Sequence, residues 1–193
     1  MYFLFLRILA MSVLAITGCA VMAQEPVLSG GPYVPTPQRV VEAMLNIAQV
    51  SDRDFVIDLG SGDGRIIITA AQKYGARGKG YDIDDELVER STLAARKLKL
   101  EQRVRFETRD VLQADIREAT VITLYLLPDM MRALRARLIS ELRPGTRIVS
   151  HDFDFGDWKP ERTVSLDLDE KYDVTGSWSS TIYLWTVPPR TVQ

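Results

Sequence analysis

The chain has 193 residues, with 24 lysines and arginines against 26 aspartates and glutamates, so its formal net charge is −2. This balance gives no sign of the basic surface that nucleic-acid binding requires, and we expect no nucleic-acid partner. A single cysteine and a single histidine exclude an internal disulfide framework and a metal site built from these residue types, so we also expect no metal.

Residues 1–23 form an apolar leader. Arg7 precedes an apolar core at residues 8–16 that is followed by small residues, the layout of a secretory signal peptide. The leader could be cleaved before Gln24, could carry a lipid at Cys19, or could remain as a membrane anchor. We therefore expect a membrane-associated or exported protein, without excluding the cytosolic face of a membrane.

Residues 24–37 are rich in proline and glycine and predict an irregular lead-in segment, followed by one domain at residues 38–193. Within this segment the run YVPTP, which begins at Tyr33, is either a rigid linker or a lid over a bound ligand. Pro37 is suited to begin a helix that extends to about Ala48.

Residues 55–68 (FVIDLGSGDGRIII) predict a buried strand, a tight glycine turn and the start of a helix. Asp58 ends the strand. The turn contains Gly60, Ser61, Gly62 and Gly64. Glycine permits a left-handed backbone and close approach of a ligand, and the helix N-terminus offers free N–H groups. A dinucleotide motif would need glycine at Arg65, and the lysine of a phosphate-binding P-loop is absent.

The pattern D-x-G-x-G-x-G resembles motif I of the seven-stranded, class I S-adenosylmethionine-dependent methyltransferases. This resemblance implies S-adenosylmethionine as the cofactor, held by Asp58 and the residues of the glycine turn. An acidic turn suits this cofactor, because its sulfur is cationic and it has no phosphate.

A second strand is predicted at residues 78–83, and a helix follows from 84 to about 100. Asp82 has the position of the acid that accepts ribose hydroxyls in nucleotide-binding folds, and Ile83 would cover a face of the adenine. A third strand at residues 104–107 precedes Asp110, which could accept from the adenine amino group, and Val111.

Residues 120–127 are almost continuously apolar, as in a central parallel strand. We expect Tyr125 at the end of this strand to lie near the cofactor and the transferred methyl group. A helix is predicted at residues 130–142 and a fifth strand at 146–150. His151 follows this strand, and a lone histidine is more often structural than catalytic.

Residues 163–168 and 180–187 predict an antiparallel strand pair that closes the sheet. The order is a first helix, five strand–helix units and a terminal hairpin. It predicts a doubly wound, Rossmann-like α/β fold with a seven-stranded sheet and helices on both faces.

The segments YVPTP, DLGSGDGRI, GYDID, YLLP and H-x-F-x-x-x-x-W-K-P together resemble a narrower group. This group is the protein-lysine N-methyltransferase family that includes the enzymes for the ATP synthase c subunit and the adenine nucleotide translocase. The resemblance covers roughly residues 32–185. It implies a protein substrate that presents a lysine and can be embedded in a membrane, although the leader here looks like a bacterial export signal.

Methyl transfer to lysine needs a deprotonated amine, and an apolar pocket lowers the amine pKa by desolvation. Tyr125 and Tyr33 are candidates for orienting that amine. Two other functions fit the sequence: methylation of a quinone, lipid or other metabolite, and a non-enzymatic exported binding module. The sequence leaves the oligomeric state open.

Overall fold

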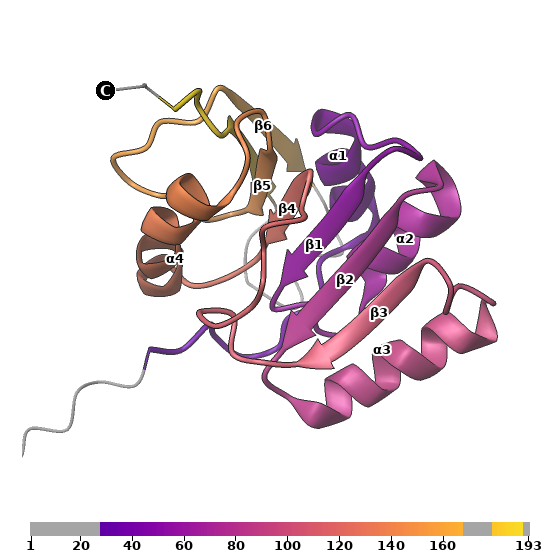
Figure 1. The fold of residues 1–193 in the computed structure, drawn as a ribbon. Helices are drawn as coiled ribbons and strands as arrows, with labels where there is room; N and C mark the ends of the chain where they lie inside the picture. The colour runs from indigo at the N-terminus through magenta and orange to yellow at the C-terminus, as the bar shows by residue number, and fades with distance from the viewer. Residues whose placement is uncertain (1–27, 168–178, 191–193) are drawn as a thin grey trace, which may run out of the picture.

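A seven-stranded sheet forms the centre of the computed structural model, which describes residues 28–167 and 179–190 (Figure 1). The strand order is β3-β2-β1-β4-β5-β7-β6. The strands are β1 (Phe55–Leu59), β2 (Arg77–Asp82), β3 (Val104–Thr108), β4 (Val121–Leu124), β5 (Arg147–His151), β6 (Arg162–Asp167) and β7 (Ser179–Thr186). The helices are α1 (Gln38–Ile47), α2 (Arg65–Tyr74), α3 (Asp85–Lys97) and α4 (Pro128–Glu141). The expectations for the leader, including Cys19 and Gln24, lie outside the described residues.

The five strands from β1 to β5 run parallel, with β1 paired to both β2 and β4. Strand β7 pairs antiparallel with β5 on one side and with β6 on the other. The predicted doubly wound sheet with a terminal antiparallel pair is therefore confirmed. No helix within the described residues is long and apolar enough to cross a membrane.

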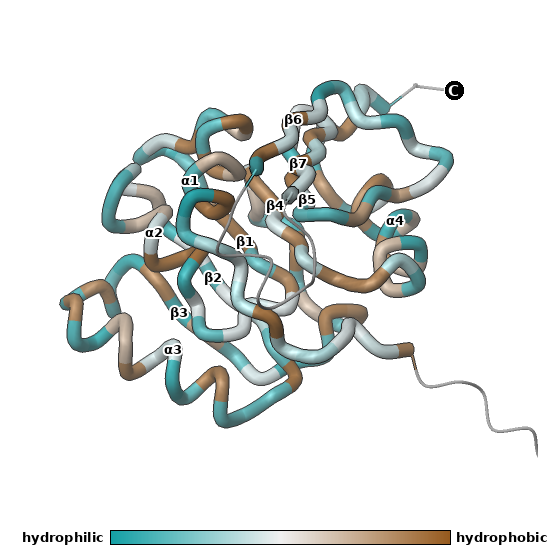
Figure 2. The backbone as a smooth tube through the Cα atoms, turned by 180° about the vertical axis from the view of Figure 1, so that it is seen from behind, coloured by the Kyte–Doolittle hydropathy of each residue, from teal (hydrophilic) through white to brown (hydrophobic). Residues whose placement is uncertain are grey.

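Helices cover both faces of the sheet, and side chains alternate between two cores. Helices α1, α2 and α3 lie on one face, where Val56, Val121 and Val149 point. Helix α4 lies on the other face, where Ile57, Ile122 and Ile148 point (Figure 1). Figure 2 shows hydrophilic and hydrophobic residues in alternation along α3.

The prediction of five strand–helix units is wrong. Helices follow β1, β2 and β4, whereas β3 leads to β4 through turns and β5 leads to β6 through an irregular segment. Side chains from these connections take the place of helices in the core. Ile116 from the first connection and Phe155 from the second are both buried, and Phe155 packs edge-on against Trp185 with ring centroids 4.7 Å apart.

Some boundaries also differ from the prediction. The predicted strand at residues 120–127 ends at Leu124, because the chain turns away from the sheet to contact the lead-in segment. There the Leu127 N–H donates to the Gly30 carbonyl at 3.0 Å, and Pro128 starts α4 two residues earlier than predicted. His151 is the last residue of β5 and is fully buried.

Candidate functional site

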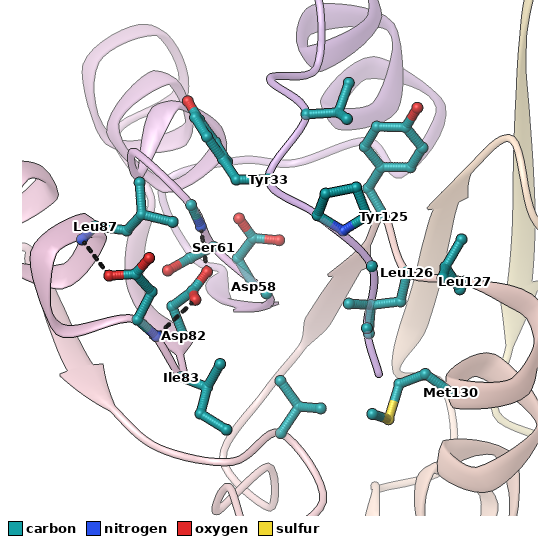
Figure 3. A pocket seen from close by; sticks show the side chains of 18 of the residues that line it. Tyr33, Asp58, Ser61, Asp82, Ile83, Leu87, Tyr125, Leu126, Leu127 and Met130 are labelled. Carbon is teal, nitrogen blue, oxygen red and sulfur yellow. Dashed lines mark hydrogen bonds between the residues drawn. The ribbon is translucent and has the colours of Figure 1, made fainter. Parts of the chain in front are cut away.

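A cavity of about 690 Å³ lies at the carboxyl ends of the parallel strands (Figure 3). The loops that follow β1, β2, β3 and β4 form its floor and walls, and residues 28–36 of the lead-in segment lie along it. In doubly wound folds this edge of the sheet is where ligands bind, because loops from several strands converge there.

The glycine turn after β1 is held against the end of β2. The backbone N–H groups of Gly60 and Ser61 both donate to the Tyr81 carbonyl, at 2.8 and 2.9 Å. Gly62 has a φ of +53°, and a Cβ added there would lie 2.5 Å from the Tyr33 ring. This position therefore requires glycine both for its backbone conformation and for its contact with the lead-in segment.

Asp82, at the end of β2, also holds the glycine turn in place. Its Oδ2 accepts from the Gly62 N–H at 2.7 Å, and its Oδ1 accepts from the Asp84 N–H at 3.1 Å (Figure 3). Asp84 in turn caps α3 by accepting from the Glu86 and Leu87 N–H groups. Each carboxylate oxygen has two lone pairs, so Asp82 retains the capacity to accept from ligand hydroxyls.

Asp58 is 2% exposed, and its Oδ1 accepts from the Thr123 hydroxyl at 2.7 Å. The pKa of Asp58 is raised to about 7, mainly by burial and also by the charges of Asp82 and Asp63, whereas the hydrogen bond from Thr123 lowers it. Three carboxylates therefore lie close to one another beside the glycine turn. This arrangement favours a ligand that carries positive charge.

The loops after β2 and β3 form one end of the cavity. Ile83 is 74% exposed, an unusual position for a large apolar side chain beside a cavity. Asp110 accepts from the Leu112 N–H at 2.8 Å, which shapes the turn that carries Val111 into the cavity wall. The guanidinium of Arg137 on α4 donates to the Val111 and Leu112 carbonyls and so fastens this turn.

The opposite wall is apolar and comes from the loop after β4 and from α4, as Figure 3 shows for Leu126, Leu127 and Met130. Tyr125 stands at the edge of this wall. Burial raises the pKa of Tyr125 to about 12, and the charge and hydrogen bond of Asp152 contribute to the shift. The cavity thus has an acidic side and an apolar side that meet near the glycine turn.

The lead-in segment is attached to the cavity at both ends. Gly30 accepts from Leu127 as described above, and the Thr36 carbonyl accepts from Arg65 Nη1 at 2.9 Å. Arg65 also forms an ion pair with Asp63 at 2.7 Å. Tyr33 lies between these two points and against Gly62, and burial together with the charge of Asp63 raises its pKa. The segment is thus held along the cavity, and its role as a lid or as a rigid linker stays a prediction.

The structure brings nearly all the predicted site residues together. The predicted residues that line the cavity are Tyr33, Asp58, Gly60, Ser61, Gly62, Asp82, Ile83, Asp110, Val111 and Tyr125. Gly64 does not line it: Gly64 is the N-cap of α2 with a φ of +78°, and it packs against Phe106 and Ser91. The sequence interpretation missed Asp63, Arg65, Leu87, Met130 and Phe153, which also line the cavity. Each of these residues lies within a few positions of a predicted motif, and this closeness is the signal that could have identified them.

The cavity residues fit S-adenosylmethionine on four observations. Among the residues that the structure describes, the buried Ser61 hydroxyl lacks a hydrogen-bond partner. A ligand in the turn can supply one. The acidic side suits a cationic cofactor with ribose hydroxyls, and exposed Ile83 suits a flat base. The apolar wall suits a methyl group and its acceptor.

Comparison with known proteins agrees with this fit. Residues 58–162 match the family model described as the ANTKMT methyltransferase domain. A protein-lysine N-methyltransferase of Saccharolobus islandicus is 40% identical over 157 residues, which cover 81% of this chain and 93% of that protein. The lysine N-methyltransferase of the ATP synthase c subunit from Rattus norvegicus is 32% identical over 138 residues, which cover 72% of this chain. The match spans 63% of the rat protein's length.

Solved structures give the same fold. A crystal structure described as an RNA methyltransferase from Salinibacter ruber, in complex with S-adenosylhomocysteine, is 47% identical with a TM-score of 0.74. The match covers 83% of this chain and 97% of that one. A methyltransferase from Geobacter sulfurreducens with the same bound molecule, 14% identical, matches in fold with a TM-score of 0.67 over 82% of this chain and 94% of its own. The chain therefore belongs to the ANTKMT methyltransferase family, and it is an enzyme that uses S-adenosylmethionine as its cofactor.

Proposed function

We propose that this enzyme transfers a methyl group to a lysine amine of a protein, and that this protein lies in or at a membrane. The observation that carries the proposal is the apolar wall of the cavity beside the glycine turn, in a chain 40% identical to a protein-lysine N-methyltransferase over 93% of that protein. A lysine side chain is an apolar stem with an amine at its tip, which suits such a wall.

The acidic side of the cavity would hold the cofactor. Asp58 and the turn residues Gly60, Ser61 and Gly62 would receive its charged portion, and Asp82 would accept its ribose hydroxyls. Ile83 and Val111 would cover the adenine, whose amino group would donate to Asp110. When bound, the cofactor supplies a methyl group on a cationic sulfur.

The apolar side would prepare the acceptor. Leu126, Leu127, Met130 and Phe153 exclude water, which disfavours the charged ammonium and lowers the pKa of a lysine placed against them. A neutral amine placed there would form a bond to the methyl carbon as the carbon–sulfur bond breaks. The sulfur would leave as a neutral thioether, and the methylated ammonium would release a proton to water. Tyr125 and Tyr33 flank the place where the two sides meet and would orient the amine for in-line displacement.

The membrane part of the proposal is supported by the short distance between the apolar leader and the cavity. The leader ends at residue 23, and Leu28 already lines the cavity. Five residues of extended chain span at most about 18 Å. If the leader enters a membrane, the cavity must lie near the membrane surface, where lysines at the ends of spanning segments are found.

RNA is a second candidate acceptor because the Salinibacter ruber structure is described as an RNA methyltransferase. Against it stands the net charge of −2, since RNA binding usually involves a basic surface. Both candidates share the cofactor half of the site and differ only in the acceptor.

Labelling tests these acceptors directly. The full-length protein is incubated with methyl-tritiated S-adenosylmethionine and with membranes, soluble protein, RNA and a lipid extract from the source cells, each separately. We expect acid-stable label in a membrane protein, recovered as methyl-lysine after hydrolysis. Label confined to soluble protein would contradict the membrane part, and label in RNA or lipid would contradict the lysine acceptor.

Two variants control the labelling. Asp82→Ala removes the anchor of the glycine turn and should abolish the label, whereas Asp157→Ala removes an acid whose side chain is 98% exposed and should leave it unchanged.

A further inference from the structure

Residues 28–36 of the lead-in segment connect the apolar wall of the cavity to the glycine turn, and every residue of this stretch lines the cavity. On the apolar wall, the Gly30 carbonyl accepts from the Leu127 N–H at 3.0 Å. At the glycine turn, the Tyr33 ring lies against Gly62. The segment therefore joins the two sides of the cavity between which a bound ligand must lie.

Arg65, the first residue of α2, fastens this segment at its end nearest to α1. Its Nε and Nη2 donate to the two carboxylate oxygens of Asp63 at 2.9 and 2.7 Å, which fixes the plane of the guanidinium. Its Nη1 donates to the Thr36 carbonyl at 2.9 Å. One side chain thus holds both the glycine turn, through Asp63, and the lead-in segment, through Thr36.

A second pair of aspartate and arginine in the same chain shows which of these contacts is particular to Arg65. Arg117 Nε and Nη2 donate to Asp115 at 2.9 and 2.7 Å, the same arrangement as between Arg65 and Asp63. In both pairs the arginine N–H also donates to the aspartate at 3.2 Å. The described hydrogen bonds of the Arg117 side chain all go to Asp115, and this side chain is 73% exposed against 32% for Arg65. The pair therefore forms without a distant partner, and the contact with Thr36 is what distinguishes Arg65.

The Thr36 carbonyl is an effective place to hold the segment. Thr36 directly precedes Pro37, the N-cap of α1, so the segment leaves a fixed helix at this point. A hydrogen bond to the Thr36 carbonyl fixes the peptide plane there, and with it the direction in which the segment runs. Pro32 and Pro35 each fix their own φ, which stiffens the stretch beyond Thr36. A change of direction at Thr36 would therefore move the whole stretch relative to the cavity.

We propose that Arg65 is a positioning residue that holds the lead-in segment across the cavity, so that S-adenosylmethionine and S-adenosylhomocysteine dissociate when its contact with Thr36 opens. The segment lines the cavity along its length, so its release removes one side of the ligand's enclosure. The proposal concerns the cofactor half of the site and does not depend on which acceptor the enzyme methylates.

The dissociation rate of the cofactor tests this directly. Full-length protein is loaded with tritiated S-adenosylmethionine, chased with excess unlabelled S-adenosylmethionine and filtered at intervals. We expect Arg65→Ala to raise the dissociation rate constant at least about tenfold. Arg117→Ala is the matched control, since it breaks an ion pair of the same geometry, and it should keep the wild-type rate. An unchanged rate in Arg65→Ala, or an equal rise in Arg117→Ala, would overturn the proposal.

Arg65→Lys separates the contact with Thr36 from the effect of charge. Lysine keeps a positive charge beside Asp63, but its one nitrogen replaces the three that hold Asp63 and Thr36. We expect the dissociation rate in Arg65→Lys to rise nearly as much as in Arg65→Ala. Loss of the charge alone would slow the release of a cationic cofactor, so faster release is not a charge effect. A wild-type rate in Arg65→Lys would contradict the proposal.

Hydrogen exchange without any ligand tests the segment itself. The Leu127 amide donates to Gly30 at the end of the segment away from Thr36, so its exchange reports whether the segment stays in place. We expect this amide to exchange at least about fivefold faster in Arg65→Ala and at the wild-type rate in Arg117→Ala, with β1 and β4 unchanged in both. Unchanged exchange at Leu127 in Arg65→Ala would show that Arg65 does not hold the segment. Faster exchange throughout β1 and β4 would show a general loss of stability instead, and it would equally refute the proposal.

Discussion

Gly62 shows at the scale of one residue how the glycine turn and the lead-in segment are fitted together. Its φ is +53°, and a Cβ would collide with the Tyr33 ring at 2.5 Å. We expect Gly62→Ala to lower the affinity for S-adenosylmethionine at least about tenfold, because the turn or Tyr33 must shift out of the cavity. Calorimetric titration measures the effect.

Gly145→Ala is the matched control for Gly62→Ala. Gly145 has a φ of +86°, but nothing lies within 4 Å of the position its Cβ would take. This variant should lose about 1–2 kcal/mol of unfolding free energy through backbone strain alone and keep its cofactor affinity. Equal effects of the two substitutions on affinity would mean that contact with Tyr33 is irrelevant.

Asp58 leads to a prediction about pH. Its pKa is raised to about 7 by burial and by Asp82 and Asp63, so its carboxyl is largely neutral at pH 6 and largely ionised at pH 8. A cationic ligand favours the ionised form, so its binding below pH 7 must expel a proton. We expect the affinity for S-adenosylmethionine to rise about tenfold per pH unit up to roughly pH 7 and then to level off.

Asp58→Asn isolates this effect, because asparagine can still accept from Thr123 but does not titrate. At pH 8 the variant should bind S-adenosylmethionine more weakly than the wild type does. Its affinity for S-adenosylmethionine should change little between pH 6 and 8. A wild-type affinity that stays constant over this range would contradict the role assigned to Asp58.

At the scale of elements, the amino ends of β1, β4 and β5 are joined by one buried acid. Asp54 is 5% exposed, accepts from the Thr120 hydroxyl and the Ser51 N–H, and forms an ion pair with Arg147. Asp54→Ala should lower the unfolding free energy by about 2–4 kcal/mol, because it leaves these donors unpaired. Urea denaturation measures this loss.

Because Asp54 lies at the sheet edge opposite the cavity, Asp54→Ala should leave the cofactor affinity of the folded enzyme within about twofold of the wild type. Asp115→Ala is the comparison: its ion pair with Arg117 is exposed, with side chains 57% and 73% accessible, and its loss should cost less than about 1 kcal/mol. A similar cost for both variants would show that the Asp54 network does not join these strands.

At the scale of the whole molecule, the last strand completes the sheet and its core. Strand β7 lies between β5 and β6, contributes fully buried Trp185 to the core, and holds Asp152 through Thr181. A chain that ends at Asp167 should therefore show no cooperative thermal transition. A chain that ends at Arg190 keeps every described residue and should unfold as the full-length protein does. Cooperative unfolding of the shorter chain would show that β7 is dispensable.

Much of the fold was predictable because short-range patterns report it. Alternating and continuous apolar runs located the strands, and the helix predicted from residue 84 begins there, with Asp84 as its N-cap. The absence of helices after β3 and β5 was not predictable, because Ile116 and Phe155 occupy places in the core that only the packed sheet defines. The buried face of α3 was not predictable either, because the helix buries Ser91 and Ala95 while Leu93 and Leu98 stay exposed.

The sequence by itself determined the class of fold, the cofactor and the turn that receives the cofactor. Glycine spacing and acids at strand ends are local requirements for binding S-adenosylmethionine, so they can be recognised in the sequence. Only the tertiary structure decided which distant residues meet at the turn. It brought Tyr33 onto Gly62 and Arg65 onto Thr36, and it packed the His151 ring against Tyr125. These contacts join residues far apart in the chain, and no local pattern encodes them because they depend on how the sheet edges and the lead-in segment pack.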